Sequence, residues 1–516
     1  MKLFENSKNK NIDNKITNIP KINDYRQKQI FEKVSENIEY LKAIQENSWD
    51  LITNELVLEN KYQKLPIGIV YYTGLIDQQF LNKSIIDGLG ENFKNLDREL
   101  KTPDQIFEYF RRSMILSLSI DDAEDYGKLY NLLASGDLVL FLDNCTKCII
   151  IGARMYQERP VEKPTTQITV KGSNDAFNEN LLTNISLIRK RIKNPNLIVK
   201  NLIIGNDSNT NVAIMYIKGL ANPTTVQEIT EELNKINAPN IFDSSYIMHY
   251  LNKDQYTLFP LVYDTERPDS IMGSLCEGRI VVLVDNSPFV LVLPTVFIQF
   301  IQSTEDYFQK SIIASFLRIL RLIAFFLAIF LPALYTVIIF HNSELLPIVL
   351  ISSIAGQRIN VPLPAAVELF LIMIAFDILK EGGTRMPTAL GSTLSFVGAI
   401  IIGQSAVEAG LISPIIVIIV ALIGICGLLL PNYNLNLTVS ILRYPVTLAT
   451  VFLGFYGLTL SGIIIIIHLA SLKSFGVNYF APFAPFNKFA VSDSFIRLPI
   501  KKMFRKKNNT LEKMHQ

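Results

Sequence analysis

Apolar positions divide this chain into two parts of different character. Before Leu322 polar and apolar residues are mixed, whereas from Leu322 to Leu472 apolar segments follow one another and are interrupted by Pro and Gly. Apolar segments of about 20 residues match the thickness of the hydrocarbon core of a bilayer. The pattern therefore predicts a soluble region followed by an α-helical multi-span membrane domain.

The soluble region contains an internal repeat. Residues 69–77 (IVYYTGLID) resemble residues 214–222 (IMYIKGLAN), and each is an apolar strand pattern that ends at a Gly turn. Residues 136–144 (GDLVLFLDN) likewise parallel residues 278–286 (GRIVVLVDN), a strand that runs into an Asp-Asn turn. Because the two matches occur in the same order, the sequence predicts two related lobes.

Helical patterns lie between the repeated strands. Thr225 is a candidate N-cap, because Glu228 follows in the first turn and apolar residues then recur every three or four positions, at Val226, Ile229, Leu233 and Ile236. Strands with intervening helices place each lobe in the α/β class. The expected fold is an α/β soluble region made of two related lobes, followed by the helical membrane domain.

Composition and pattern together predict five segments. Residues 1–38 are polar, with too few apolar residues for a core, and are expected to form a disordered tail. The others are a first lobe at 39–165, a second lobe at 166–310, a membrane domain of four to six spans at 311–475 and a basic cytoplasmic tail at 476–516. Because the net charge is only +2, no nucleic-acid partner is expected.

The sequence carries none of the common catalytic signatures. It lacks GxxxxGK[ST], HExxH and GxSxG motifs and has four His residues, so no enzymatic activity, cofactor or metal site is expected. Cys145 and Cys148 form a CxxC pair, but the repeat aligns them with Ser287 and Val290. A hairpin turn without thiol chemistry is therefore favoured over redox or metal binding. Four cysteines in all fit a reducing compartment.

A run of basic residues lies in the soluble region at positions 189–193 (RKRIK). It belongs to a helical pattern with Ile185, Ile188 and Ile192 on one side. A solvated helix face is the favoured interpretation, and a contact to anionic lipid or to a partner is the alternative.

The membrane region holds five long apolar candidates and one short one. They lie at about 322–340, 363–379, 389–409, 414–430 and 447–470, with the short piece at 345–354. Arg318 and Arg321 precede the first span, and a series of cations from Lys488 to Lys507 follows the last. By the positive-inside rule both ends are cytoplasmic, which requires an even number of crossings. Four crossings with re-entrant or interfacial elements are favoured over six.

A stripe of small residues marks the third of these segments. The small residues repeat at every fourth position, at Gly391, Ser395, Ala399 and Gly403, and so allow a neighbouring helix to approach closely. The sequence leaves three roles open for this stripe: packing within one bundle, packing between subunits and lining a pore. After it, Gly410 predicts a helix stop and Ser413-Pro414 predicts the start of the next helix, which together form a tight helical hairpin.

Three carboxylates in or near the apolar spans are candidate functional groups, because a charged side chain is costly to place in lipid. Glu368 and Glu408, with Gln404 one turn before Glu408, are candidates for an ion pathway or a subunit contact. Asp377 is interpreted instead as a helix-end carboxylate near Lys380.

Longer stretches carry a family resemblance. They are NENLLTNISLIRKRI (178–192), YIKGLANP (216–223), TERPD (265–269), EGRIVVLVDNSPFVLVLP (277–294), QSTEDY (302–307), VPLPAAVELFLIMIAFDILKEGGTRMP (361–387) and GAIIIGQSAVEAGLISP (398–414). Over most of its length the chain resembles the A subunit of GerA-type nutrient germination receptors of endospore-forming bacteria. It departs at Leu182, where Arg is expected, and after Phe495-Ile-Arg497, where Lys-rich sequence replaces the usual aromatic ending.

The resemblance implies an integral subunit of a receptor complex in the inner membrane of the dormant spore, with the lobes and the C-terminal tail on the cytoplasmic (core) side. It implies three kinds of partner besides the lipid bilayer: a transporter-like B subunit that senses the nutrient, a lipoprotein C subunit, and further copies of the chain, for which a pentamer is one arrangement. It also implies a nutrient-gated channel that releases monovalent cations. The alternatives are a non-conducting scaffold or signal-relay subunit and, less favoured because no repeat is evident among the spans, a secondary transporter.

Overall fold

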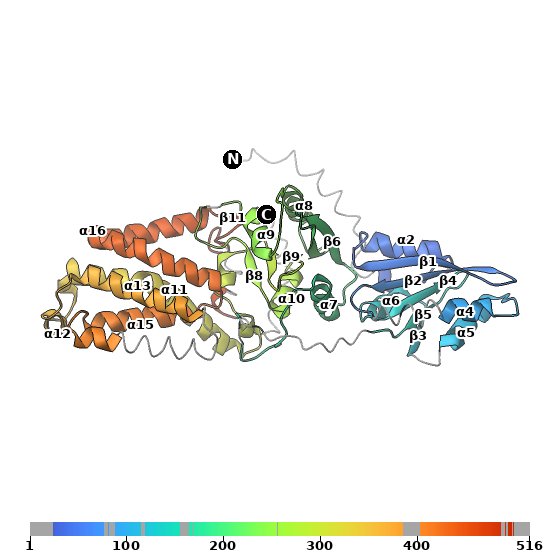
Figure 1. Ribbon diagram of the computed structural model, residues 1–516, viewed down its shortest axis with the longest axis horizontal. Coiled ribbons are helices and arrows are strands. Elements are labelled where there is room, and N and C mark those ends of the chain that lie inside the picture. The colour runs from blue at the N-terminus through green and yellow to red at the C-terminus, as the bar shows by residue number, and fades with distance from the viewer. Residues whose placement is uncertain are drawn as a thin grey trace, which may run out of the picture. The chain divides into compact units, whose positions relative to one another are not determined.

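The computed structural model forms two compact units (Figure 1). The α/β unit comprises residues 1–165, 173–252 and 264–293, and the helical unit comprises residues 166–172, 253–263 and 294–516. The sequence boundaries at 38, 165, 310 and 475 stay predictions. The residues that the structure describes are 24–76, 81, 88–114, 119–154, 164, 166, 167, 169–254, 256–384, 403–486, 491, 494–497 and 499.

The first lobe of the α/β unit is a five-stranded sheet with strand order β1-β2-β4-β5-β3. Neighbouring strands are antiparallel throughout. The elements of this lobe are η1 (Asp24–Gln27), α2 (Val34–Ile44), β1 (Leu51–Glu59), β2 (Lys64–Tyr72), α4 (Gly88–Lys94), α5 (Pro103–Met114), β3 (Ile120–Ala123), α6 (Tyr126–Leu133), β4 (Leu138–Leu142) and β5 (Cys148–Ile151).

Helices cover both faces of this sheet, which explains why β4 is apolar at every position. Successive side chains of a strand point to opposite faces. Leu138 and Leu140 pack in the core that includes α4 and α5, whereas Val139 and Phe141 pack in the core that includes α2 and α6. Both faces are buried, so an alternating polar pattern is absent from the strand.

The second lobe repeats the arrangement of the first. Its sheet has the strand order β6-β7-β9-β10-β8, which matches the first sheet strand for strand. The repeated sequence segments fall on equivalent strands, β2 with β7 and β4 with β9, as the repeat predicted. The elements are α7 (Leu181–Arg191), β6 (Leu197–Ile204), β7 (Thr210–Ile217), α8 (Pro223–Asn234), α9 (Ser244–Leu251), β8 (Tyr263–Thr265), α10 (Pro268–Cys276), β9 (Ile280–Val284) and β10 (Val290–Leu293).

The repeated Asp-Asn turn has the same local role in both lobes. Asn144 and Asn286 adopt positive φ angles of 62° and 67°, a conformation that Asn tolerates better than most residues. The preceding Asp143 and Asp285 accept hydrogen bonds from the first backbone N–H groups of α2 and α7, at 3.3 and 3.2 Å. Each turn therefore caps the first helix of its own lobe, which explains why both residues recur.

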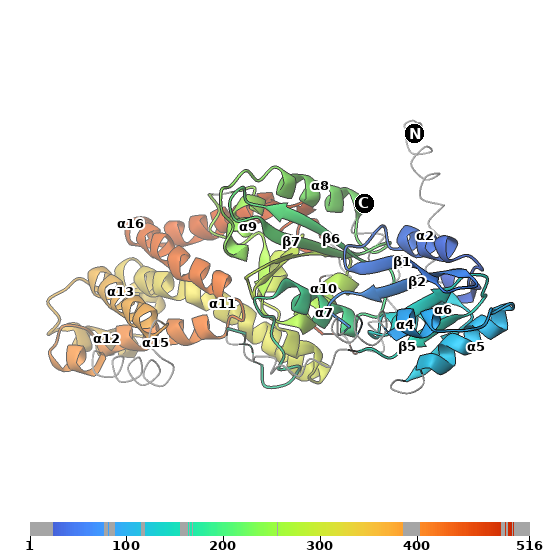
Figure 2. The ribbon, with the colours of Figure 1, turned by 45° about the vertical axis from the view of Figure 1, so that its right-hand side comes forward.

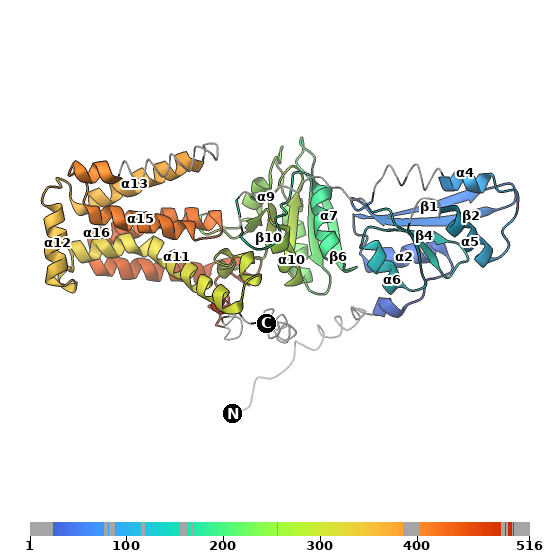
Figure 3. The same cartoon turned by 90° about the horizontal axis from the view of Figure 1, so that it is seen from below.

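In the described part of the helical unit, long helices run side by side (Figures 2 and 3). The described helices of this unit are α11 (Ser311–Phe340), α12 (Ile348–Arg358), α13 (Ala365–Thr384), α15 (Pro414–Leu428) and α16 (Tyr433–Ser471), accompanied by η3 (Phe297–Phe300), η4 (Thr304–Tyr307), η5 (Ser343–Leu345), β11 (Lys473–Ser474) and β12 (Val477–Asn478). Among the described residues, α11 and α16 are the helices long and apolar enough to cross a bilayer, judged by length and composition.

Helix α16 is a hairpin of two arms rather than one rod (Figures 1 and 2). Gly454 has φ 58° and ψ −135°, which interrupts the helix. Thr438 in the first arm donates a hydrogen bond to the carbonyl of Leu258 (2.6 Å), and His468 in the second arm bonds to the neighbouring Thr257 (2.8 Å). Because both ends of α16 meet the same loop, the chain reverses at Gly454.

The described helices bear on several expected spans. The first, at 322–340, lies within α11, which begins at Ser311. The last, at 447–470, is wrong as a single span, because Gly454 divides it. The short piece at 345–354 corresponds to η5 and α12, and none of the residues of α12 is buried. Most of the expected span at 389–409 lies outside the described residues.

Candidate functional site at the start of helix α11

A short capped turn precedes the first long apolar helix. Ser303 is the N-cap of η4, and its hydroxyl accepts a hydrogen bond from the backbone N–H of Glu305 (3.4 Å). The carboxylate of Asp306 accepts in return from the backbone N–H of Ser303 (3.3 Å), which completes a capping box. This reciprocal capping fixes the Asp306 carboxylate at the start of α11.

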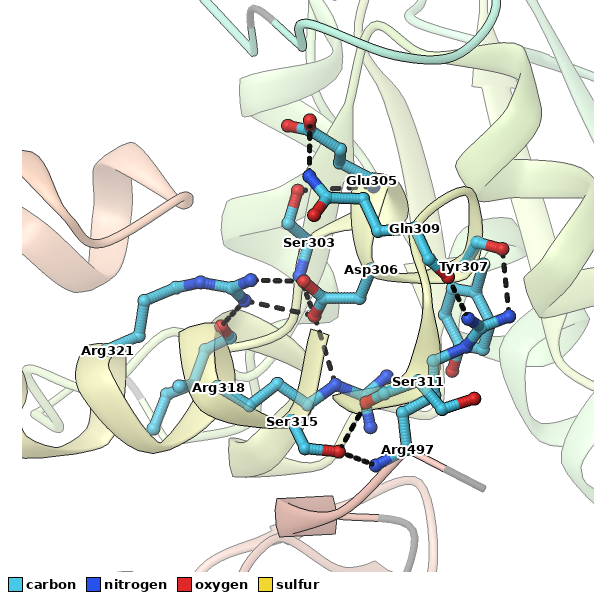
Figure 4. Close-up of polar contacts among 11 residues, drawn as sticks. Ser303, Glu305, Asp306, Tyr307, Gln309, Ser311, Ser315, Arg318, Arg321 and Arg497 are labelled. Atoms are coloured by element: carbon cyan, nitrogen blue, oxygen red, sulfur yellow. Dashed lines mark hydrogen bonds and ion pairs between the residues drawn. The ribbon is translucent and has the colours of Figure 1, made fainter. Parts of the chain in front are cut away.

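Asp306 is buried between two arginines of α11 (Figure 4). Arg318 donates to its Oδ2 (3.0 Å), and Arg321 donates to both of its oxygens, at 3.1 Å to Oδ2. Arg321 also donates to the carbonyl of Ile301 (2.7 Å). Residues three apart lie on one face of a helix, so both guanidinium groups reach one carboxylate.

Arg497 brings the C-terminal segment to the same place (Figure 4). Its guanidinium donates to the carbonyls of Tyr307 (2.8 Å) and Gln309, and its backbone N–H donates to the hydroxyl of Ser315 (3.0 Å). The Tyr307 ring lies 5.4 Å from the Arg318 guanidinium and 5.6 Å from that of Arg497. We call Asp306, Arg318, Arg321 and Arg497 the α11 ionic cluster.

The α11 ionic cluster is suited to hold a helix start in place rather than to perform chemistry. Its charged side chains are almost fully buried, and its cations contact a carboxylate, backbone carbonyls and an aromatic face. Removing one partner from such a buried network leaves an uncompensated charge, so the network favours a single geometry. Arg318 and Arg321 were used above only as topology signals, and their pairing with Asp306 was not predicted.

A partly buried ion pair joins α13 to α16. Arg443 donates to both oxygens of Asp377, each at 2.5 Å, and the hydroxyl of Tyr444 donates to the same carboxylate at 2.5 Å. Asp377 is not at the end of α13, as expected, because α13 continues to Thr384. Its carboxylate binds α16. Lys380 instead donates to Asn436 (3.2 Å).

Glu368 is fully buried in the first turn of α13. It accepts hydrogen bonds from the backbone N–H and the hydroxyl of Ser413, the latter at 2.6 Å, and its other oxygen lies 3.8 Å from Arg358. Ser413 is the N-cap of α15 and Pro414 the first helical residue, as expected from the sequence. Glu368 thus joins the starts of two helices, and its role in an ion pathway stays a prediction.

Of the small-residue stripe and the exposed ion-pathway candidates, the structure describes Gly403, Gln404 and Glu408. Gly391, Ser395 and Ala399 lie outside the described residues. Gly403 is buried, and a Cβ added there would lie 3.3 Å from Val417 of α15, so its contact is within the chain. Gln404 donates to Glu408 (2.8 Å), and both side chains are exposed. Their part in an ion pathway also stays a prediction.

The interpretation of the basic run at 189–193 as a solvated face is wrong for Arg189. This side chain is 1% exposed and donates to Asp50 (2.8 Å) in the first lobe and to the carbonyl of Leu197 (2.9 Å). Its guanidinium stacks on Tyr72, 4.1 Å from the ring centroid. Burial disfavours the charge of Arg189, but Asp50 outweighs burial and raises its pKa. Arg189 therefore joins the two lobes.

The chain matches the family model described as Bacillus/Clostridium GerA spore germination protein from residue 39 to residue 509. It belongs to the GerA family. Spore germination protein KA of Bacillus subtilis (strain 168) is 37% identical over 90% of this chain and 84% of its own length. Spore germination protein A1 of the same organism is 34% identical over 92% of this chain and 95% of its own length.

One solved structure is similar to the N-terminal part of this GerA chain. It is the N-terminal domain of the A subunit of the Bacillus megaterium spore germinant receptor GerK3, with 30% identity and a TM-score of 0.42. The match covers 53% of this chain and 99% of that structure. The family match and the two Bacillus subtilis relatives support the assignment of the chain as a germinant receptor subunit.

The CxxC pair of this GerA chain is buried. Burial raises the pKa of Cys145 to about 11 and raises that of Cys148 further. Thiolates are the reactive form, so this environment opposes redox or metal chemistry. Among the described residues, no group of three or more His, Cys, Asp and Glu side chains is placed to hold a metal ion.

Proposed function

We propose that this chain is the A subunit of a nutrient-responsive germination receptor and is embedded in the spore inner membrane. The family match from residue 39 to residue 509 carries the proposal, because it spans both the lobes and the helices. The proposed partners are a B subunit that senses the nutrient, a lipoprotein C subunit and further copies of the chain. The lobes and the C-terminal tail lie on the cytoplasmic side.

The proposed membrane arrangement has six passes rather than the four favoured from sequence. The starts of α13 and α15 lie together at Glu368 and Ser413, whereas later turns of both helices approach Asn436 of α16. With α11 and the two arms of α16, these helices account for five passes. Both ends were expected on one side, which requires an even number of passes, and the apolar segment expected at 389–409 is the sequence candidate for the sixth.

Within this arrangement we propose that several copies surround a cation pathway. Gln404 and Glu408 are the stronger candidates for its lining, because both are exposed in one chain, whereas Glu368 is engaged with Ser413. Acidic side chains in a low-dielectric surrounding attract cations. The α11 ionic cluster would then transmit movement of the lobes to the first helix, because it fixes the segment that joins them.

A non-conducting relay subunit is the second candidate. The observation in its favour is that Glu368 and Asp377 both make contacts between helices and so have structural partners. In that case the helices would anchor the lobes and pass the signal to another subunit.

Current across planar bilayers separates these functions. The chain is reconstituted with its B and C partners, and current is recorded with and without candidate nutrients for wild type, Glu408→Gln and the control Glu344→Gln, an acidic residue of η5. A nutrient-dependent cation current that Glu408→Gln alters and Glu344→Gln does not supports the channel. Reproducible silence from an intact, nutrient-binding complex supports the relay, and coupled uptake of a solute supports a transporter.

A further inference from the structure

The buried carboxylate of Glu368 is accompanied by an arginine from a helix that has no buried residue. We propose that Arg358 is a tethered counter-charge at Glu368, and that its withdrawal opens a binding site for a monovalent cation there. The inference deepens the proposed function and rests on it for the part that this site plays in conduction.

One oxygen of Glu368 is fixed by the start of α15. It accepts hydrogen bonds from the backbone N–H and from the hydroxyl of Ser413, the latter at 2.6 Å. Ser413 is the N-cap of α15, where the partial positive charge of the helix favours an anion. Tyr335 of α11 lies close enough to interact with the Glu368 charge, and it packs with Leu369 and Ile416 in an apolar cluster. The carboxylate is therefore held in place independently of Arg358.

The other oxygen, Oε2, accepts no hydrogen bond from the residues that the structure describes. The Nε atom of Arg358 lies 3.8 Å from it, whereas arginines contact Asp306 and Asp377 at 3.0 and 2.5 Å. Charge-assisted hydrogen bonds strengthen ion pairs and fix their geometry. Arg358 thus supplies positive charge to Oε2 without such a bond, and a dissolved cation can supply the same charge.

Arg358 belongs to a helix that packs little against the rest of the helical unit. None of the 11 residues of α12 is buried, and Ile348 is 83% exposed. The Arg358 side chain also donates to the carbonyl of Leu363 (3.4 Å). Segments with few buried contacts open at a low free-energy cost. Withdrawal of Arg358 with α12 is therefore less costly than movement of α13 or α15, which have buried apolar residues.

Withdrawal of Arg358 releases two oxygen atoms, Oε2 of Glu368 and the carbonyl oxygen of Leu363. Carboxylate and carbonyl oxygens are the ligands that alkali-metal cations prefer. A buried carboxylate without a counter-charge is costly, which favours entry of a cation. Because one carboxylate balances one positive charge, a monovalent cation fits this site better than a divalent one.

The segment after Arg358 contacts the segment that carries the proposed pathway lining. A Cβ added to Gly410 would lie 3.4 Å from the carbonyl oxygen of Asn360. Asn360 follows Arg358 by two residues, and Gly410 follows Glu408 by two residues. A movement of the lining therefore reaches the segment of Arg358 through a direct contact.

Hydrogen exchange of the reconstituted full chain tests the site. It is measured in KCl, in NaCl and in the chloride of the bulky cation N-methyl-D-glucamine, all at about 0.15 M so that screening is equal. In wild type, exchange of peptides that cover residues 365–384 and 411–428 should not depend on the cation, because Arg358 neutralises Glu368. In Arg358→Gln, exchange should be about tenfold slower in KCl or NaCl than in N-methyl-D-glucamine chloride, as for a cation at about ten times its dissociation constant.

Further variants separate the site from a general disturbance of α12. Combining Arg358→Gln with Glu368→Gln removes both charges and should abolish the cation dependence, whereas the neighbouring control Gln357→Ala should behave as wild type. Arg358→Met, which keeps an unbranched stem, replaces Arg358→Gln if that variant does not fold. Cation dependence that persists in the double variant, or none in the single variant, overturns the site. A wild type that responds as strongly as the single variant overturns the role of Arg358.

Current across planar bilayers distinguishes this inference from the proposed function. Without nutrient, Arg358→Gln should conduct cations several-fold better than wild type, and equal currents contradict a role of the site in conduction. A nutrient-dependent current without cation-dependent exchange in Arg358→Gln contradicts the site alone. Cation-dependent exchange without any current contradicts the channel and supports the site.

Discussion

Asp306→Asn is the sharpest test of the α11 ionic cluster. The substitution keeps the shape of the side chain and one acceptor oxygen but removes the negative charge between Arg318 and Arg321. Because both guanidinium groups are almost fully buried, they would be left without their counter-charge. Removing one partner of a buried ion pair costs about 3–5 kcal/mol of stability. Because the amide oxygen of the new side chain still accepts a hydrogen bond, we expect a loss at the lower end, about 3 kcal/mol.

Hydrogen exchange of the reconstituted protein measures this loss locally. A loss of about 3 kcal/mol in the free energy of local opening corresponds to about a hundredfold faster exchange of protected amides. We expect this change in peptides that cover residues 297–325 and no change in peptides from β6 to β10 of the α/β unit. Glu305→Gln is the matched control, since Glu305 lies in the same turn and its partner is the uncharged Gln309.

A charge-free variant checks that the effect comes from the unpaired cations. In Asp306→Leu combined with Arg318→Met and Arg321→Met, apolar packing replaces the buried charges, so exchange should return towards the wild-type rate. Exchange within twofold of wild type in Asp306→Asn would refute the reasoning. So would a charge-free variant that opens as readily as the single one.

Three further predictions concern other contacts. Asp377→Asn should lower the thermal stability of the purified protein more than the double variant Asp377→Leu/Arg443→Met; equal losses would show that the charges do not interact. Burial raises the pKa of Glu46, but hydrogen bonds from Lys218 and Tyr216 outweigh this and hold it below the ordinary value of 4.5. The contribution of the Glu46 carboxylate to the stability of the lobe contact is therefore present above pH 4.5 and lost as the pH falls through the lower folded-state pKa. Glu46→Gln should reduce the acid sensitivity of unfolding. An unchanged pH profile of stability would contradict this prediction. Gly454→Ala should destabilise the helical unit by about 1–3 kcal/mol, because Gly454 has a positive φ angle and an added Cβ would lie 2.9 Å from His341. An unchanged melting temperature would contradict the placement of the α16 hairpin tip at Gly454.

Local sequence determined features that depend on a few neighbouring residues. The repeat predicted two related lobes, because matching strand patterns are local and form equivalent strands of the two sheets, β2 with β7 and β4 with β9. Ser413-Pro414 predicted the start of α15, since a cap and a fixed φ angle are local properties. The predicted cap at Thr225 is wrong by three positions, because Asn222 followed by Pro223 provides the stronger local signal.

Tertiary structure alone decided which charges meet. Arg189 pairs with Asp50 across 139 positions of the chain, and Asp377 pairs with Arg443 across 66. Local periodicity carries no information about such partners, so Arg189 was misread as part of a solvated face. Burial makes each pairing obligatory, since a buried charge needs a counter-charge, but only the packing of lobes and helices decides which residue supplies it.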